Sequence, residues 1–473
     1  MVVFISWLTE HRRFKTDHNH NNNNNRWMFK NEKLDILGIL AFDTAKSVSR
    51  LVSLYKALSQ NEVQRLRNEV IKSRGISFLV SQDDGFLMKL ACAERLEDLD
   101  RAANAVARLG LKCSDYGLVR FGQVYKDLKA GFVDMEKLNN YGSKEMEKSV
   151  NKMEKFTSLT GELYAELEVL AELEASERRL IEWKKKNNNT PDTNYDLFDQ
   201  KVYNQRKLVR HLKDVSLWNQ CYDKIVGRMA KMVCLLYARI CTLFGPHVST
   251  KYGHKNHSSG PTPQTSMSGP IHCTARKAPL VRFLSRDSNV FITEPVGLRH
   301  KTVSLTHEMK IFQAAPPSTV GGSGLANRYA NVILLAAKYL NSETLISDQA
   351  REKMYNMLPN SLIKYVRSKL RVAWRETEEE VYGCDALAEG WRQALNEMLE
   401  WLVPMAQDTL TWQAERNLEK QRFDAKPIVL LMQTLHYADL EKTEAVIAEI
   451  LVGLSCVYWY ENRRISCVDM DVY

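Results

Sequence analysis

The chain of 473 residues is 44% hydrophobic and 26% charged, with a formal net charge of +9. This length suffices for two or three hydrophobic cores, and the globular composition excludes a fibrous or wholly disordered protein. The nine cysteines are an odd number with no CxxC pair and no histidines at zinc spacing, which argues against a disulfide framework and a structural zinc site. We expect reduced, mostly buried thiols in a cytosolic or nuclear protein.

Neither end of the chain carries a pattern typical of secretion or membrane insertion. The apolar run Val2–Leu8 has seven residues and precedes the basic residues, which is the wrong length and polarity for a secretory signal. The stretch Ile450–Tyr460 has eleven residues, well short of the roughly 20 that span a bilayer. We therefore expect no secretion and no transmembrane segment. The asparagine tract His18–Asn25 is of low complexity and predicts a disordered tail over residues 1–30.

The first patterned segment predicts a helix over Leu34–Leu58, because its apolar residues recur at the three- and four-residue spacing of one buried helical face. Ser59 and Ser81 each stand three residues before an acidic residue, which is the spacing of a capping box at a helix start. Gly75 and Gly110 stand where helices would end. Three helices are thus predicted before Gly110.

A long charged helix with a near-heptad apolar seam follows. Its seam residues alternate four and three apart: Met146, Val150, Met153, Thr157, Thr160, Tyr164, Leu167 and Ala171. A homodimeric coiled coil is one interpretation, but a second apolar row widens the stripe. We favour an antiparallel hairpin with a second helix predicted over Lys201–Phe244, because short loops such as Asn187–Asn194 usually join antiparallel neighbours. Residues 31–245 together are predicted to form an N-terminal helical domain.

Residues 246–317 are predicted to form a disordered basic linker. Between Lys251 and Lys310, nine Lys/Arg stand against three acidic residues, a net contribution of +6. The segment is also rich in Pro, Ser, Thr and Gly, a composition that buries too little apolar surface to order itself. Four of its basic residues are candidate contacts for an anionic partner: Arg276, Lys277, Arg282 and Arg286.

Arg282 also stands three residues before Ser285, a spacing that basophilic kinases use. A phosphate on Ser285 would add roughly two negative charges and offset a third of the surplus charge of the linker. Phosphorylation is therefore predicted to release an acidic partner. Intact-mass analysis of the protein from growing tissue tests this hypothesis.

After the linker, residues 318–462 are predicted to form a C-terminal helical domain, followed by a tail over 463–473. One helix is expected over Leu325–Leu340, a second begins at Ser347, and a third is capped by Asn360 or Ser361. The further apolar faces and the breaks between them are Trp391–Trp401, Val429–Trp459, Pro404 and Pro427. The predicted fold class is all-α, with two helical-bundle domains joined by the linker.

No residue pattern in the sequence predicts catalysis. The sequence Gly321-Gly-Ser-Gly324 precedes a helix, whose first N–H groups attract anions, but no Lys-Ser or Lys-Thr of a Walker loop follows Gly324. The eleven histidines include no HExxH pair, and the acidic run Glu376–Glu380 is typical of a solvated helix face. No nucleophile turn marks a Ser-His-Asp or Cys-His assembly. We predict no enzymatic activity, no cofactor and no metal ion.

Several separate motifs nevertheless resemble one plant family. Those of the N-terminal half are Leu37–Phe42, Leu66–Val70, Gly75–Ser81, Arg108–Gly110, Tyr125, Ser216–Gln220 and Tyr222–Lys224. Those of the C-terminal half are Gly324–Ala326, Tyr329–Val332, Leu358–Pro359 and Trp401–Pro404. In this order they resemble the PSK-simulator family of plant growth regulators, whose members carry one domain of unknown function near each end. The resemblance covers about residues 31–245 and 318–460.

The resemblance implies promotion of plant growth, in relation to peptide-hormone and brassinosteroid responses, from the nucleus, the cytoplasm or the cell periphery. It brings no catalytic residue. Gly324, Tyr329 and Asn331, which lie in the matched C-terminal motifs, are candidate contacts for a partner or a phosphate. Some relatives begin with Met-Gly and a nearby serine, a myristoylation signal, whereas this chain begins with Met1-Val2. We therefore expect it to fall in the subgroup without that signal.

Three functions from different classes stay open on the sequence alone. The favoured one is an all-α adaptor whose two helical domains bind growth-signalling proteins. The second is weak peripheral binding to anionic membranes through the linker, where each Lys or Arg contributes about 1 kcal/mol. The third is nucleic-acid binding by the same basic residues, with Phe283 available to stack on a base. The sequence identifies neither the partners nor the oligomeric state.

Overall fold

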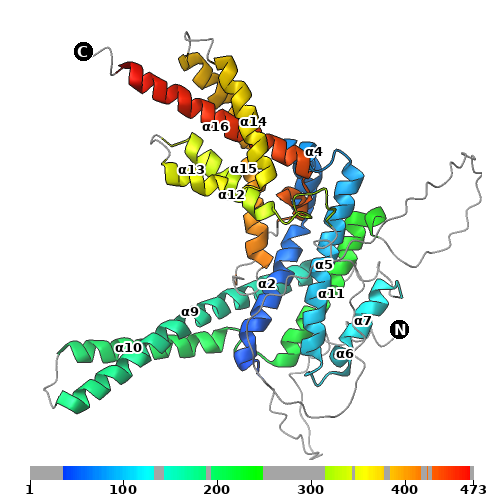
Figure 1. Cartoon of the computed structure of the whole chain (residues 1–473). Coiled ribbons are helices and arrows are strands. Elements are labelled where there is room, and N and C mark those ends of the chain that lie inside the picture. Colours follow the sequence, from blue (N-terminus) through cyan, green and yellow to red (C-terminus); the bar gives the residue numbers. More distant parts are fainter. Residues whose placement is uncertain are drawn as a thin grey trace, which may run out of the picture. The chain divides into compact units, whose positions relative to one another are not determined.

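A computed structural model describes residues 36–132, 143–187, 193–248, 315–342, 347–377, 384–416, 423 and 429–468. Within these ranges the chain is helical, with two isolated β-bridges and no β-strand (Figure 1). The all-α prediction is confirmed. Residues 36–248 and 315–468 form two helical domains, each with its own main hydrophobic core. The tail predicted over 1–30 and most of the predicted linker lie outside the described residues.

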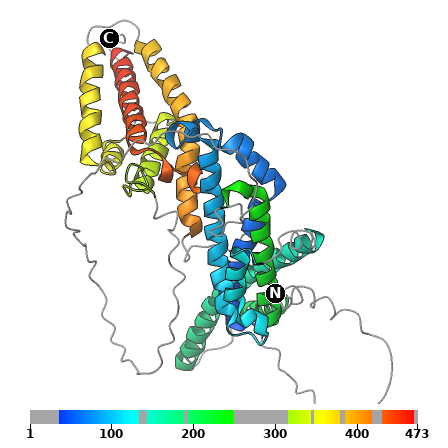
Figure 2. The same ribbon diagram turned by 90° about the vertical axis from the view of Figure 1, so that its right-hand side faces the viewer.

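Three long helices form the centre of the N-terminal domain: α2 (Ala41–Ala57), α5 (Asp84–Gly110) and α11 (Tyr222–Phe244). α5 packs against both α2 and α11, and the three run side by side in both views (Figures 1 and 2). The predicted apolar face of α2 is buried, since Val48, Leu51 and Leu54 are at most 1% exposed. The predicted first helix is confirmed, although α2 begins only after a 3-10 turn at Gly38–Leu40.

The helix starts before Gly110 differ in part from those predicted. Ser59 caps α3 (Gln60–Arg65) as expected, because its hydroxyl accepts the N–H of Glu62. The cap of α5 is Asp83, not Ser81, and its carboxylate accepts hydrogen bonds from the N–H groups of Gly85 and Phe86. The described chain forms four α-helices up to Gly110, instead of the three predicted.

Gly75 does not end a helix, contrary to the prediction. It lies inside the additional helix α4 (Arg74–Leu79). A Cβ at this position would approach Met405 Sδ to 2.6 Å and the backbone oxygen of Trp401 to 3.2 Å. Gly75 therefore permits close packing of α4 on the C-terminal domain.

Two short helices close one end of the N-terminal domain: α6 (Tyr116–Val119) and α7 (Phe121–Lys129). The hydroxyl of Tyr125 donates to Asp100 at 2.7 Å, and Lys129 pairs with the same carboxylate at 3.0 Å. Gly110 ends α5 as predicted. It allows the backbone carbonyl of Leu118 to approach closely, since a Cβ at Gly110 would lie 2.2 Å from that oxygen.

The predicted long helix is α9 (Ser143–Asn187), which forms an antiparallel hairpin with α10 (Thr193–Val215). The prediction of one helix over Lys201–Phe244 is wrong, because the chain leaves the helix at Ser216 and re-enters it at Tyr222 as α11. This break puts Leu217 in the core and lets Gly38 donate its N–H to the carbonyl of Trp218 at 2.9 Å. The α9–α10 hairpin thus projects from the domain, and α11 belongs to the main core (Figure 1).

The C-terminal domain has five α-helices and two short 3-10 helices within the described ranges, with α15 and α16 packed together at its centre. The α-helices are α12 (Ala326–Leu340), α13 (Asp348–Tyr355), α14 (Asn360–Thr377), α15 (Cys384–Arg416) and α16 (Leu440–Val468). The predicted break at Pro404 is absent, because α15 continues through this residue. Leu402, Met405 and Ala406 are all buried around it, so tertiary packing outweighs the missing hydrogen bond of the proline.

Two of the described helices are long and apolar enough to cross a membrane by length and composition, over Tyr222–His247 and Leu440–Tyr460. The expectation of no transmembrane segment rested on the length of uninterrupted apolar runs, a criterion that does not reveal these two helices. Their apolar windows are 56% and 61% buried within the protein, as in the core helices of a folded domain. Because their apolar residues belong to the two main cores, we assign them to the folded domains.

Candidate functional site

The glycine turn before α12 donates its N–H groups to protein acceptors. Val320 and Gly321 donate to the carbonyls of Ala438 and His436, both at 2.9 Å. The following N–H groups donate to acceptors inside the turn, Gly322 to the hydroxyl of Thr319 and Gly324 to the carbonyl of Gly321. A phosphate would have to displace these bonds. The turn is therefore built to dock against the 436–438 segment, and Gly324 supplies its positive φ of 73°.

The three candidate residues of the C-terminal motifs do not converge on one site. Gly324 and Asn331 are exposed, whereas Tyr329 is fully buried. The Tyr329 hydroxyl donates to the Glu444 carboxylate at 2.5 Å, and burial raises the pKa of this phenol well above its usual value. Asn331 donates from its side chain to the carbonyl of Asn327. Tyr329 therefore ties α12 to α16, and its role in this structure is packing.

The remaining predicted site residues, which are Arg276, Lys277, Arg282, Arg286 and Ser285, lie outside the described residues. Among the residues that the structure describes, no group of three or more His, Cys, Asp and Glu is placed to hold a metal ion. The six cysteines whose side chains the structure describes are free thiols, and burial raises the pKa of Cys92 and of Cys234 to about 12. Thiolate chemistry is correspondingly disfavoured at these two positions.

A buried carboxylate joins the two domains. Glu94 on α5 is 1% exposed and accepts hydrogen bonds from the indole N–H of Trp412 at 2.9 Å and the backbone N–H of Leu431 at 2.7 Å. The Trp412 ring stacks on His436, which is itself buried, with the ring centroids 6.1 Å apart. Two charge-assisted bonds satisfy this buried carboxylate and hold the domains to each other. The sequence offers no signal for Glu94, whose partners lie more than 300 residues away.

The α9–α10 hairpin is held together by complementary charges. The six glutamates of α9 between Glu162 and Glu177 lie in a segment that has no Lys or Arg, whereas α10 between Lys201 and Lys213 carries five Lys/Arg and no acid. Gln205 donates to Glu166 at 2.6 Å, and Arg206 pairs with Glu177 at 2.7 Å and Glu174 at 3.2 Å. Attraction between these opposite blocks favours the pairing of the two helices, in addition to the apolar contacts between them.

The hydrophobic core of the hairpin is small. Its cluster contains only three fully buried residues among those described, Leu163, Val209 and Leu212. On α9, no residue after Leu163 is buried among the side chains described, although the helix continues to Asn187. On the outer part of α10, Val202 is buried, but the outer half of the hairpin has much less apolar burial than the two main domains.

Four exposed apolar residues form a row along one side of the hairpin. This outer apolar row consists of Val169, Leu180, Leu197 and Leu208, which are 42%, 36%, 67% and 40% exposed. Val169 and Leu180 each stand three residues after a glutamate that contacts α10. Leu208 stands three residues after Gln205, which contacts α9. Antiparallel helices turn in opposite senses along a common axis, so the same offset from the contact line puts these residues on the same side of the hairpin.

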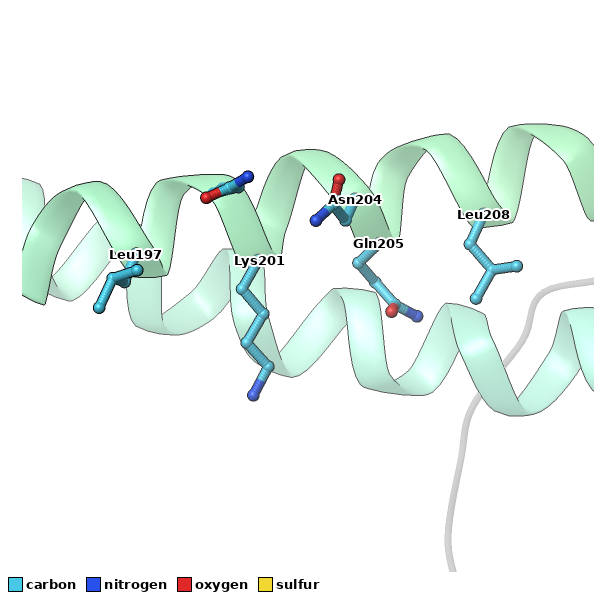
Figure 3. A pocket seen from close by; sticks show the side chains of 6 residues that line it. Leu197, Lys201, Asn204, Gln205 and Leu208 are labelled. Atoms are coloured by element: carbon cyan, nitrogen blue, oxygen red, sulfur yellow. The ribbon is translucent and has the colours of Figure 1, made fainter.

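A shallow hollow of about 350 Å³ lies along the α10 part of this row. Its walls are formed by Leu197, Gln200, Lys201, Asn204, Gln205 and Leu208. Figure 3 shows labelled side chains from this set spread along α10, with α9 running beside it. The hollow is open and has apolar ends, with Lys201 and amide groups between them. Such a surface suits the side chains of a partner helix better than an enclosed small molecule.

Comparison with known proteins supports the resemblance inferred from the motifs. Residues 39–95 match the family model "Domain of unknown function (DUF3475)", and residues 319–411 match "Protein of unknown function (DUF668)". The α9–α10 hairpin lies outside both matched regions. No solved structure gives a significant match.

Three curated relatives from Arabidopsis thaliana match most of this chain. Protein PSK SIMULATOR 1 is 24% identical over 88% of this chain and 55% of its own length. Protein PSK SIMULATOR 3 is 23% identical over 88% and 56%, and Protein PSK SIMULATOR 2 is 23% identical over 92% and 61%. The chain spans little more than half the length of these relatives, and its place in a subgroup without a myristoylation signal stays a prediction. The chain is therefore a homologue of the PSK SIMULATOR proteins, and the family resemblance of its motifs is confirmed.

Proposed function

We propose that the chain is a non-enzymatic regulator of plant growth that acts as a helical adaptor in the nucleus or cytoplasm, with the α9–α10 hairpin as its binding arm. The observation that carries the proposal is the outer apolar row, exposed on a hairpin with a small core of its own. The relatives, named PSK SIMULATOR, support a regulatory role connected with PSK.

The proposed partner presents an amphipathic helix. The exposed fractions of the row add up to about two leucine side chains, whose burial contributes roughly 3–5 kcal/mol before the cost of association. A helix laid against α9 and α10 would cover the row at three- and four-residue spacing. Lys201 lies among the lining residues and is exposed, so an acidic residue of the partner beside its apolar stripe would complement it.

Affinity purification of the tagged full chain from growing plant tissue tests the proposal. Leu197→Glu introduces a charge into the row, and Leu111→Glu is a matched control because the two leucines are 67% and 68% exposed. We expect a discrete set of growth-signalling proteins to be lost with Leu197→Glu and retained with Leu111→Glu, together with loss of growth promotion only for Leu197→Glu. Equal recovery and equal growth with both variants would exclude the hairpin as the binding arm.

A further inference from the structure

A second surface, on the C-terminal domain, combines basic and apolar residues. α14 packs on α16 and buries Leu362, Val366 and Leu370, each of which is at most 7% exposed. Between Asn360 and Trp374 the helix carries four Lys/Arg and no acidic residue. One of these cations, Lys369, pairs with Glu449 of α16 and lies over the Tyr365 ring. This basic segment lies outside the linker, to which the sequence pattern had pointed as the basic part of the chain.

The other three cations lie on the solvent side of α14. Lys364, Arg367 and Arg371 are exposed and follow the three- and four-residue spacing of one helical face. In the part of the chain that the structure describes, no acidic side chain forms a salt bridge with any of them. These three cations therefore form a block of positive charge on the exposed side of α14, ahead of the acidic run Glu376–Glu380 in the sequence.

Three large apolar side chains flank these cations. Tyr365, Val372 and Trp374 are 43%, 55% and 44% exposed. By their spacing, Tyr365 and Val372 lie on one flank of the cations, and Trp374 lies on the other. We call these six residues the α14 basic face: Lys364, Tyr365, Arg367, Arg371, Val372 and Trp374. Figure 2 shows α14 at the edge of the C-terminal helices, with one side next to α16.

We propose that the α14 basic face binds the surface of an anionic phospholipid membrane. The face is the convex side of a single helix, which fits a flat surface. Lys and Arg attract anionic headgroups, and a Trp ring is favoured at the boundary between headgroups and acyl chains. Val372 adds an aliphatic side chain, whose partial insertion among the acyl chains is favourable. Such a side chain cannot stack on a nucleic-acid base. A membrane therefore fits the charge and the apolar residues together.

The proposal differs from membrane binding through the linker, and the experiment separates the two. The full chain is prepared with Arg276, Lys277, Arg282 and Arg286 changed to Gln, so that the linker contributes little charge. Sedimentation is then measured with vesicles of phosphatidylcholine alone and of phosphatidylcholine with phosphatidylserine. The test variant is Lys364→Gln/Arg367→Gln/Arg371→Gln. The matched control is Lys72→Gln/Arg74→Gln/Lys89→Gln, which removes three exposed cations from the N-terminal domain.

We expect binding to the anionic vesicles only, and a loss on the order of one hundredfold in the test variant, since each cation contributes about fivefold near such a surface. The control should bind like its parent. Trp374→Ala should weaken binding several-fold, and Ser368→Glu, which adds a negative charge to the exposed side of the helix, should do the same. Circular dichroism checks that each variant is folded. Equal losses in the two triple variants, or no binding to the anionic vesicles, would overturn the proposal.

Discussion

The indole N–H of Trp412 donates a hydrogen bond to the carboxylate of Glu94 at 2.9 Å, joining α15 of the C-terminal domain to α5 of the N-terminal domain. The same carboxylate accepts the backbone N–H of Leu431, so one side chain connects two segments of the C-terminal half. The two domains thus share a buried polar contact, although each has its own core. Glu94 is therefore a buried polar link between α5 and the C-terminal half.

Glu94→Ala should destabilise the protein by about 2–4 kcal/mol, because it leaves two buried N–H donors without their acceptor. Trp412→Phe removes one of these donors and should cost less, about 1–2 kcal/mol. Urea unfolding followed by circular dichroism measures both. The control is Glu352→Ala, at an exposed position, which should change the free energy of unfolding by less than about 0.5 kcal/mol. Similar values for Glu94→Ala and Glu352→Ala would contradict the role of this contact.

The stability of the protein should depend on the ionisation of Asp408. Burial raises the pKa of this carboxyl to about 6, despite the opposing effect of Arg65. The folded state therefore binds more protons than the unfolded state between roughly pH 4 and pH 6, and the free energy of unfolding falls as the pH rises through this window. Above pH 6 the Asp408 carboxylate is charged, which lowers the free energy of unfolding. Because Asp408 is only partly buried, we expect this cost to be about 1 kcal/mol.

Asp408→Asn removes this penalty and keeps a polar group beside Gln433, whose side-chain amide lies 3.5 Å from the carboxylate. The variant should be more stable than its parent by about 1 kcal/mol at pH 8 and equally stable at pH 4. Urea unfolding at both pH values measures the difference. A stability difference that is the same at the two pH values would contradict the assigned pKa.

Three glycines should respond differently to alanine. A Cβ at Gly321 would lie 2.2 Å from Nδ1 of His436, so Gly321→Ala should cost more than about 2 kcal/mol. Gly324 has open space but a φ of 73°, and its change to Ala should cost about 1 kcal/mol. Gly390 lies inside α15 with open space, so Gly390→Ala should stabilise by about 0.5–1 kcal/mol. Thermal unfolding gives the order, and any other order would contradict the described backbone.

The hairpin should unfold without the main domains. Leu163 is fully buried in the small core of the hairpin, and Leu163→Ala should cost about 2–4 kcal/mol there. Hydrogen exchange should become faster in α9 and α10 and stay slow in α5 and α11. Leu208→Ala, at an exposed position of the same hairpin, is the matched control and should leave exchange unchanged. Faster exchange in α5 as well would show that the hairpin and the domain unfold together.

Local patterns predicted the elements with strong periodicity. The apolar spacing indicated α2 and α12, and the serine before an acid indicated the cap of α3. The hairpin also followed from local signals, because a proline-containing loop separates two long charged helices. The break between α10 and α11 had no such signal, since Ser216–Cys221 contains neither proline nor glycine and is set by tertiary bonds from Leu37 and Gly38.

Features that depend on distant partners could not be predicted. Glu94 looks like any acidic helix residue, and only the fold brings Trp412 and Leu431 to it. Pro404 locally predicts a break, because the packing that holds α15 together around it is not local. The candidate interaction surfaces on the α9–α10 hairpin and on α14 could not be predicted for the same reason. The exposure of Leu197 and of Trp374 depends on which helix face the rest of the fold covers.

The most direct measurement is site-specific photo-crosslinking in growing plant tissue, with a photoreactive amino acid placed in the full chain at position 197 or, as the matched control, at position 111. We expect position 197 to crosslink to a discrete partner protein, Leu208→Glu in the same chain to abolish this product, and position 111 to give none. The same product from both positions, or a product at position 197 that survives Leu208→Glu, would contradict the claim that the α9–α10 hairpin is the binding arm.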